Sequence, residues 1–322
     1  MTADRSDPDV GERPNGPGVV AESASGIVYG LLAYLSWGLV PLFWPLVKPA
    51  GAVEILAHRI LWSLLFAVIG MVVLRRLGRI GPHPLAPARQ PRTFAILAVA
   101  AAAIAINWGL YIWAVNNGHV LEASLGYYIN PIISIGLGVL VLRERLRHLQ
   151  WAAVGFALLA VIVLTVTLGQ PPWISLGLAT SFGLYGLLKN RVRIGALASL
   201  VIESALLAPI ALGYLSFLGV RGQLTLLSGG PGHAALLITS GLVTLLPLLW
   251  FSAAAARLPL SMVGLLQYVT PTMQFLLGYL WFGEAMPLGR WIGFGLVWVA
   301  LVLLTADVLR RLRSRSTRRG SE

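Results

Sequence analysis

Apolar stretches of about twenty residues follow one another along the chain, with short polar segments between them. A helix of that length crosses the hydrocarbon core of a bilayer, so each stretch predicts one membrane-spanning helix. Ten spans are expected, near residues 26–47, 53–74, 93–115, 121–142, 150–169, 173–189, 196–219, 233–256, 261–282 and 289–309. The stretch at 173–189 is the weakest, because it contains several hydroxyl residues and Lys189. Short buried helices of a soluble core are the alternative, which the long run of weakly charged stretches disfavours.

The composition of the chain supports a membrane location. Of the 322 residues, 57% are apolar and 11% are charged, and the mean hydropathy is +0.80. A soluble domain carries about 25% charged residues, so this chain lacks the polar surface that a soluble protein of its size needs. The absence of cysteine excludes a disulfide framework and a cysteine nucleophile. No nucleotide-binding or metalloprotease motif is present in the sequence, and neither a cofactor nor a metal is predicted.

The net charge of +12 is distributed unevenly across the predicted membrane. If both termini lie in the cytoplasm, nearly all basic loop residues share that side, and only Lys48, Arg221 and Arg290 lie outside. Cytoplasmic loops of membrane proteins carry an excess of Lys and Arg, so both termini are predicted to be cytoplasmic. A nucleic-acid partner, which such a charge suggests in a soluble protein, is therefore not predicted.

Polar tails flank the predicted spans. Residues 1–25 are rich in Gly, Pro, Ser and acidic residues, which predicts a disordered cytoplasmic tail and not a signal peptide. Residues 310–322 are predicted to form a basic cytoplasmic tail. Its arginines are expected to contact anionic lipid headgroups: Arg310, Arg311, Arg313, Arg315, Arg318 and Arg319.

The sequence repeats itself. A shift of 140 residues places Tyr128 on Tyr268, Pro131 on Pro271 and Glu144 on Glu284 without a gap. The chain therefore divides into two five-helix repeats, at 26–169 and 173–309. An odd number of spans gives the two repeats opposite orientations in the membrane. Inverted repeats with a binding site between them at the bilayer midplane are typical of secondary transporters.

Two prolines occupy matched positions in the middle of the fourth and ninth predicted spans. Asn130-Pro131 and Thr270-Pro271 are predicted to break their helices, because proline lacks an N–H and clashes with the preceding turn. Backbone carbonyls freed at the midplane need a partner, which a substrate could supply. The alternative is a pair of packing kinks without a role in binding.

Charged residues within the spans are the strongest candidates for function. Arg59 presents a planar fork of donors that suits a carboxylate or phosphate. A shift of 144 residues places Glu203 opposite it, and the two are expected to face each other as a substrate-binding pair or a gate. Glu203 is also a candidate proton carrier. A static buried ion pair is the alternative. Glu54 and His58, four residues apart, share a face of the same helix as Arg59.

Uncharged polar residues and one tryptophan complete the candidate substrate site. They are predicted to supply hydrogen bonds or an aromatic surface to the central cavity: Trp37, Asn107, Tyr128, Asn130, Gln267 and Thr270. Glu122 opens the fourth span, where a carboxylate suits the helix dipole. Small residues are expected where helices approach closely, at Gly136, Gly138, Gly293 and Gly295.

Two segments carry a family resemblance. The sequence from Ile55 to Ser63 (ILAHRILWS) and that from Asn107 to Pro131 (NWGLYIWAVNNGHVLEASLGYYINP) resemble the RarD proteins. These proteins belong to the EamA group of the drug/metabolite transporter superfamily, and the resemblance covers about residues 26–305. It implies an all-α membrane protein of ten helices in two inverted five-helix repeats, in a bacterial plasma membrane. Members are described as permeases, and the resemblance implies no established binding residue.

The residues and the resemblance together predict a secondary transporter that moves a small organic metabolite or drug by alternating access, with export favoured by analogy. Two alternatives stay open: a membrane scaffold that transports nothing, and a membrane enzyme that modifies lipids. The enzyme requires a polar cluster of acids, bases or metal ligands at one interface, and no His-rich or Asp-rich cluster is visible in the sequence. An enzyme is therefore not predicted, and the oligomeric state is left open.

Overall fold

A computed structural model describes residues 17–319, except residues 79, 82–83, 143–145, 193 and 259. The described part is helical and contains no strand. The first half of the chain contains α1 (Pro17–Phe43), η1 (Trp44–Val47), α2 (Ala52–Arg76), η2 (Ala86–Arg89), α3 (Pro91–Asn116), α4 (Val120–Leu142) and α5 (His148–Leu168). The second half contains α6 (Trp173–Asn190), α7 (Ala196–Val220), α8 (Thr225–Ser228), α9 (Gly230–Ala255), α10 (Leu260–Leu266), α11 (Val269–Leu276), η3 (Leu277–Trp281) and α12 (Leu288–Arg319).

Eight of the described helices are long and apolar enough to cross a membrane. They correspond to the expected spans except two. The α6 helix, at the predicted 173–189 span, has 18 residues but is not among the eight helices that are apolar enough to cross a membrane. The expected 261–282 span is divided into α10, α11 and the π-helical η3. The all-helical membrane architecture is thus confirmed.

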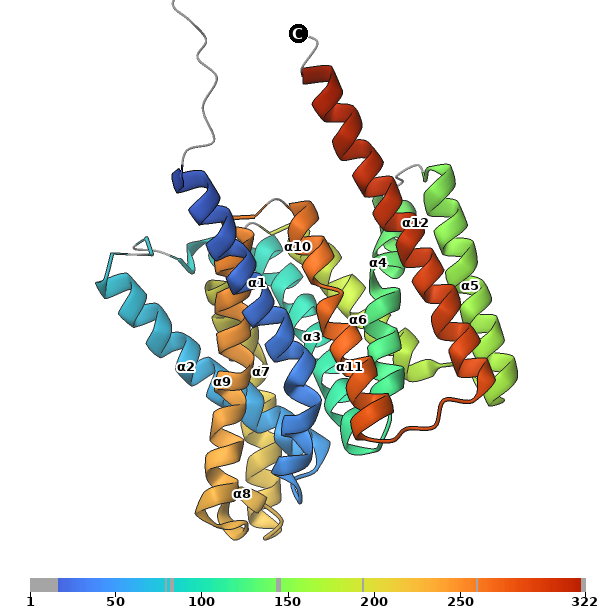
Figure 1. Cartoon of the computed structure of the whole chain (residues 1–322). Coiled ribbons are helices and arrows are strands. Elements are labelled where there is room, and N and C mark those ends of the chain that lie inside the picture. Colours follow the sequence, from blue (N-terminus) through green and yellow to red (C-terminus); the bar gives the residue numbers. More distant parts are fainter. Residues whose placement is uncertain are drawn as a thin grey trace, which may run out of the picture.

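Helices of the two halves pack mainly on each other. The most extensive contacts join α12 to α5, α4 to α6, α2 to α7 and α1 to α9, each pair taking one helix from either half. In Figure 1, α5 and α12 lie together on one side of the bundle, and α2, α7 and α9 lie on the other. The start of α1 and the end of α12 lie at the same end, and α8 lies at the opposite end (Figure 1). We call the end that holds α8 the α8 end.

Large apolar side chains are exposed along the outer helices. Leu158, Ile162 and Val166 on α5 are 60%, 50% and 76% exposed, and Val302 on α12 is 67% exposed. A soluble protein does not expose such a stripe, whereas lipid solvates it without cost. This face of the helix pair therefore suits contact with lipid.

The two prolines have different effects on their helices. The α4 helix continues through Pro131, so the predicted break at this position is wrong. In the ninth span, α10 ends at Leu266 and α11 begins at Val269, so the interruption lies at Gln267 and Tyr268. Pro271 is the third residue of α11, where its missing N–H costs no helical bond, and its ring disfavours a helix that continues back past residue 267. The break is thus asymmetric between the repeats.

The first and last helices extend into the segments that were predicted to be tails. The α1 helix begins at Pro17 and not at Gly26, because proline suits the first turn of a helix and the residues after it continue the helix. The α12 helix runs to Arg319, through most of the predicted basic tail. Residues 1–16 and 320–322, and the side chains of the tail arginines, lie outside the described part, so their lipid contact stays a prediction.

Candidate functional site

Arg59 of α2 is a buried cation without a carboxylate partner in the part of the chain that the structure describes. Its side chain is 7% exposed, and its Nε donates to Thr244 Oγ1 of α9 at 2.7 Å. The guanidinium lies 4.1 Å from the ring centre of Trp108 and 5.3 Å from that of Trp44. Among the described residues no acid pairs with it. Burial of an unpaired charge is costly, and cation–π contacts recover only part of that cost. Such a group is suited to receive an anion.

The predicted pairing of Arg59 with Glu203 is wrong. Glu203 of α7 is buried and accepts hydrogen bonds from Lys189 Nζ at 3.0 Å, Ser199 Oγ at 2.7 Å and Tyr185 Oη at 3.2 Å. Lys189 also donates to Ser199. Lys189 lies at the end of α6, and its long side chain lets the ammonium reach α7. The counter-charge of Glu203 therefore comes from the adjacent helix in the sequence.

Asn107 ties three helices together beside Arg59. Its Nδ2 donates to Leu178 O at 2.9 Å and to Ser181 Oγ at 3.1 Å, both on α6. Its Oδ1 accepts from Tyr127 Oη of α4 at 3.3 Å. The ring of Tyr127 stands edge-on to that of Tyr111, with centroids 5.7 Å apart. Trp108, on which the Arg59 guanidinium stacks, follows Asn107 in the sequence, and Tyr111 and Tyr127 pack in the same apolar cluster as Trp44, so Asn107 and Arg59 belong to one region.

Gln274 of α11 joins this region from the second half and was missed by sequence reasoning. It is 1% exposed, and its Nε2 donates to Tyr111 Oη at 2.9 Å and to Trp37 O at 3.3 Å. Its Oε1 is buried and has no hydrogen-bond partner in the described part of the chain. A glutamine four residues after Thr270, on an otherwise apolar helix face, is the signal that could have identified it. We refer to Arg59, Thr244, Asn107, Tyr111, Tyr127 and Gln274 as the Arg59 site.

The side chains of the remaining predicted site residues lie outside this network. The ring of Trp37 packs on those of Tyr34 and Phe251, with centroid distances of 5.6 and 5.8 Å. Only the backbone carbonyl of Trp37 accepts a hydrogen bond from Gln274. Thr270 Oγ1 donates to Tyr34 O at 2.8 Å.

Three further predicted residues lie on α4 and at the interruption of the ninth span. Tyr128 Oη and Thr272 Oγ1 form a hydrogen bond of 2.8 Å. Asn130 Oδ1 is buried, accepts no hydrogen bond from any described residue, and lies near Gly183 of α6. Gln267 lies at the interruption between α10 and α11, half-buried. The tertiary structure thus gathers Arg59 and Asn107 but places the other predicted residues around them.

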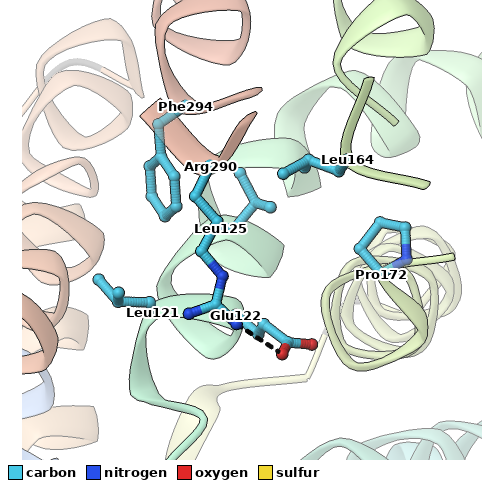
Figure 2. Close-up of a pocket in the computed structure, with 7 residues that line it drawn as sticks. All are labelled: Leu121, Glu122, Leu125, Leu164, Pro172, Arg290 and Phe294. Carbon is cyan, nitrogen blue, oxygen red and sulfur yellow. Dashed lines mark ion pairs between the residues drawn. The ribbon is translucent and has the colours of Figure 1, made fainter. Parts of the chain in front are cut away.

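A second polar region lies where α4 begins, between α5 and α12 (Figure 2). A small pocket there is lined by five uncharged side chains and by Glu122 and Arg290: Leu121, Glu122, Leu125, Leu164, Pro172, Arg290 and Phe294. Arg290 Nη2 lies 3.6 Å from Glu122 Oε1, as the dashed line in Figure 2 marks. Glu122 Oε1 also lies 3.1 Å from His119 Nδ1, so in the described part its carboxylate faces side chains of Arg290 and His119.

Glu284, in the loop before α12, caps α4 instead. The backbone N–H groups of Val120 and Leu121 donate to its two carboxylate oxygens, at 2.5 and 2.9 Å. Burial raises the pKa of Glu284, against the lowering effect of these N–H donors and of Arg290 and His119. The match of Glu284 with Glu144 in the repeat was the available sequence signal.

Loss of this cap has a defined expected effect. Glu284→Ala leaves two N–H groups of α4 without an acceptor, so we expect it to destabilise the protein by about 1–2 kcal/mol. Thermal unfolding in detergent measures this. Glu122→Gln, which removes a partly exposed charge but no cap, is the control and should change the melting temperature less. Equal melting temperatures for Glu284→Ala and the parent would contradict the capping role.

Comparison with known proteins places the chain in a family. The model of the EamA-like transporter family matches residues 24–166. Protein RarD of Streptomyces exfoliatus is 56% identical over 91% of this chain and 91% of its own length. The chain belongs to the RarD group of the EamA-like transporter family. An uncharacterized transporter of Pseudomonas aeruginosa is 44% identical to this RarD-group chain, over 89% of the chain and 95% of its own length.

The fold of the RarD-group chain also has a counterpart among crystal structures. One solved protein gives a TM-score of 0.54 over 90% of this chain and 99% of its own, at 17% identity, which concerns the fold alone. The family, its transporter-named relatives and the apolar helices make the chain a multi-pass membrane permease of the bacterial inner membrane. The resemblance that the Asn107–Pro131 segment carries is thereby confirmed.

Proposed function

We propose that this permease is a secondary transporter that carries a small organic anion across the inner membrane by alternating access, with export as the favoured direction. The buried guanidinium of Arg59, which has no acidic partner in the described part, is the observation that carries the proposal. A carboxylate or phosphate would supply the missing charge and satisfy the terminal amino groups of the arginine bidentately. Family membership supports transport but carries no substrate.

The packing of the two halves supports alternating access. Ten passes in two inverted five-helix repeats, at 26–169 and 173–309, remain our proposed layout, with α10, α11 and η3 together forming the ninth pass. The Arg59 site draws on both halves, because Arg59 and Asn107 come from the first and Thr244 and Gln274 from the second. A site shared by two halves can face either side of the membrane as they rock.

Each side chain has a proposed role in this scheme. Arg59 anchors the anionic group, and the unpartnered Oε1 of Gln274 accepts a hydrogen bond from the substrate. The free Oδ1 of Asn130 is a second acceptor. Tyr128, Thr270, Gln267 and Trp37 remain proposed secondary contacts. Proton carriage by Glu203 remains a prediction, for a group that three side chains already satisfy.

A thermal-shift screen of the purified protein tests the proposal. The panel contains benzoate, succinate, amino acids, nucleosides and chloramphenicol, because a ligand that binds the native state raises its melting temperature. We expect a carboxylate to stabilise the parent protein and to lose this effect in Arg59→Gln.

The matched control keeps the helix and changes only the position of the charge removed. Arg76→Gln removes an exposed arginine at the end of the same α2 helix and should keep the stabilisation in full. A carboxylate that stabilises Arg59→Gln as strongly as the parent would contradict the anchor role. Stabilisation by neutral compounds alone would contradict an anionic substrate.

A further inference from the structure

A third polar cluster lies in α2 on the side of Arg59 toward the α8 end, and it shares no residue with the Arg59 site. Glu54 and His58 of α2 are 3% and 2% exposed, and His233 of α9 is 9% exposed. Thr225, the first residue of the short α8 helix, lies between Glu54 and His233. These titratable groups have no part in the proposed anion site. Nor do the described residues contain a group of His, Asp or Glu arranged to hold a metal ion.

The hydrogen bonds of the cluster have a direction. Glu54 Oε1 accepts from the backbone N of Thr225 at 2.7 Å and from its Oγ1 at 2.9 Å. The threonine hydroxyl has a single hydrogen, which it donates to Glu54. Its oxygen must therefore accept from His233 Nε2, 2.8 Å away, so His233 carries its hydrogen on Nε2. The chain of donors runs from His233 through Thr225 and ends on the Glu54 carboxylate.

His58 takes no part in this series of hydrogen bonds. Its Nε2 is buried and has no hydrogen-bond partner among the described residues, although it lies 4.0 Å from Glu54 Oε1. That distance exceeds a hydrogen bond by about 1 Å. A proton on Nε2 would turn this unsatisfied atom into a charged donor aimed at the carboxylate, and charge-assisted hydrogen bonds of this kind are strong.

Few other charges act on His58. From its own helix Glu54 acts on it electrostatically, and from α9 His233 does. The acid of α7, Glu203, is engaged by Lys189, and the phenol of α3, Tyr111, is engaged by Gln274. Arg59 is the next residue along α2, and its guanidinium is held between tryptophan rings.

We propose that Glu54 and His58 form a proton-binding site, and that this proton is the coupling ion of transport. The proton adds to the lone pair of His58 Nε2 and forms an N–H bond that donates to Glu54 Oε1. No other covalent bond changes. The coupling role rests on the proposed transport of an anion, because a bound anion and a bound proton offset each other's charge in a site of low dielectric.

The position of the cluster makes such coupling mechanical as well as electrostatic. His58 and Arg59 are consecutive residues of α2, so a shift of this helix that accompanies protonation of His58 would also move the anion anchor. The chain through Thr225 holds Glu54 in place from the α8 segment. Proton binding at His58 and anion binding at Arg59 should therefore favour the same conformation, so both are carried in one direction and an outward gradient of the anion drives export.

Histidine NMR of the full chain in lipid nanodiscs tests the proton site without any substrate. The chain has five histidines, and the His58 signal is assigned by its loss in His58→Gln. We expect the His58 imidazole to convert from neutral to doubly protonated between pH 9 and pH 5. At a pH within this transition we expect a smaller charged fraction in Glu54→Gln than in the parent, whereas Glu203→Gln leaves the charged fraction unchanged.

A His58 signal that stays neutral down to pH 5, or that is unaffected by Glu54→Gln, would overturn the proposal. If Glu54→Gln fails to fold, Glu54→Asp and Thr225→Val take its place, because each disturbs the carboxylate while keeping the packing. Failure of the anion proposal is read separately, as the absence of stabilisation by any carboxylate in the thermal-shift panel.

Proteoliposomes that contain a pH-sensitive dye test the coupling role, with the carboxylate that stabilises the parent as the probe. We expect flux of the probe to move protons in the parent. His58→Gln should still be stabilised by the probe at high pH, should lose the extra stabilisation that the parent gains at low pH, and should lose the dye signal, a combination that a merely structural histidine would not produce. Probe flux without proton movement in the parent would refute the coupling role.

Discussion

Gly241→Ala is expected to destabilise the protein by about 2 kcal/mol or more, because α9 touches the backbone of α2 at this glycine. A Cβ at Gly241 would lie 2.5 Å from the carbonyl carbon of Trp62 and 2.7 Å from the backbone N of Ser63. Backbone atoms cannot move aside as a flexible side chain can, so the two helices must separate. The same contact positions Arg59 against Thr244, and binding of any anion should weaken as well.

Thermal unfolding of the purified variant measures this effect, and a fall of about 5 °C or more is expected. Gly213→Ala is the matched control, because a Cβ at that α7 position meets no atom within 4 Å. The control should match the parent or exceed it slightly, since alanine favours a helix more than glycine does. Equal melting temperatures for the two variants would mean that α2 and α9 do not approach in this way.

Lys189→Met is expected to cost about 3–5 kcal/mol, because it leaves Glu203 buried without its counter-charge. The side chain of Glu203 is 4% exposed and that of Lys189 is 20% exposed, so water screens the pair little. In Lys189→Met/Glu203→Met, the stranded charge is gone, and most of the loss should be recovered. The double-mutant cycle of melting temperatures or unfolding free energies isolates the interaction.

Arg191→Met is the control for this cycle, because Arg191 is an exposed cation two residues further along the same segment. It should change stability by less than about 0.5 kcal/mol. If Lys189→Met costs no more than Arg191→Met, the pair contributes nothing. Glu203 would then be a candidate proton carrier, as its position in the sequence indicated.

Small residues illustrate how far a sequence pattern reaches. The sequence indicated close helix contacts at Gly136 and Gly295, yet a Cβ at either position meets nothing within 4 Å. At Gly293 the expectation agrees with the contact found, against Leu164 of α5. Gly241, which no pattern distinguished, lies at a backbone contact. Which glycines lie at an interface depends on the rotation of each helix, and an apolar helix surrounded by lipid carries little periodic signal of that rotation.

The apolar spans, the all-helical architecture and the family could be determined from the sequence alone. Each span is a local property, since a run of about twenty apolar residues is stable only as a helix in a bilayer. The burial of Arg59 and Glu203 follows from the same local reasoning, because each lies within such a run. The family is carried by contiguous segments such as Asn107–Pro131, which need no knowledge of packing.

Only the tertiary structure decided the partners of those charges. Arg59 meets Thr244, 185 residues away, and Glu284 caps an N–H group 164 residues away. Glu203 was expected to form an ion pair with Arg59. It pairs instead with Lys189, which lies 14 residues earlier and whose long side chain reaches it. The repeat relates equivalent positions, not positions in contact, so an offset in sequence does not predict which side chains meet. That information resides in the rotation and separation of packed helices.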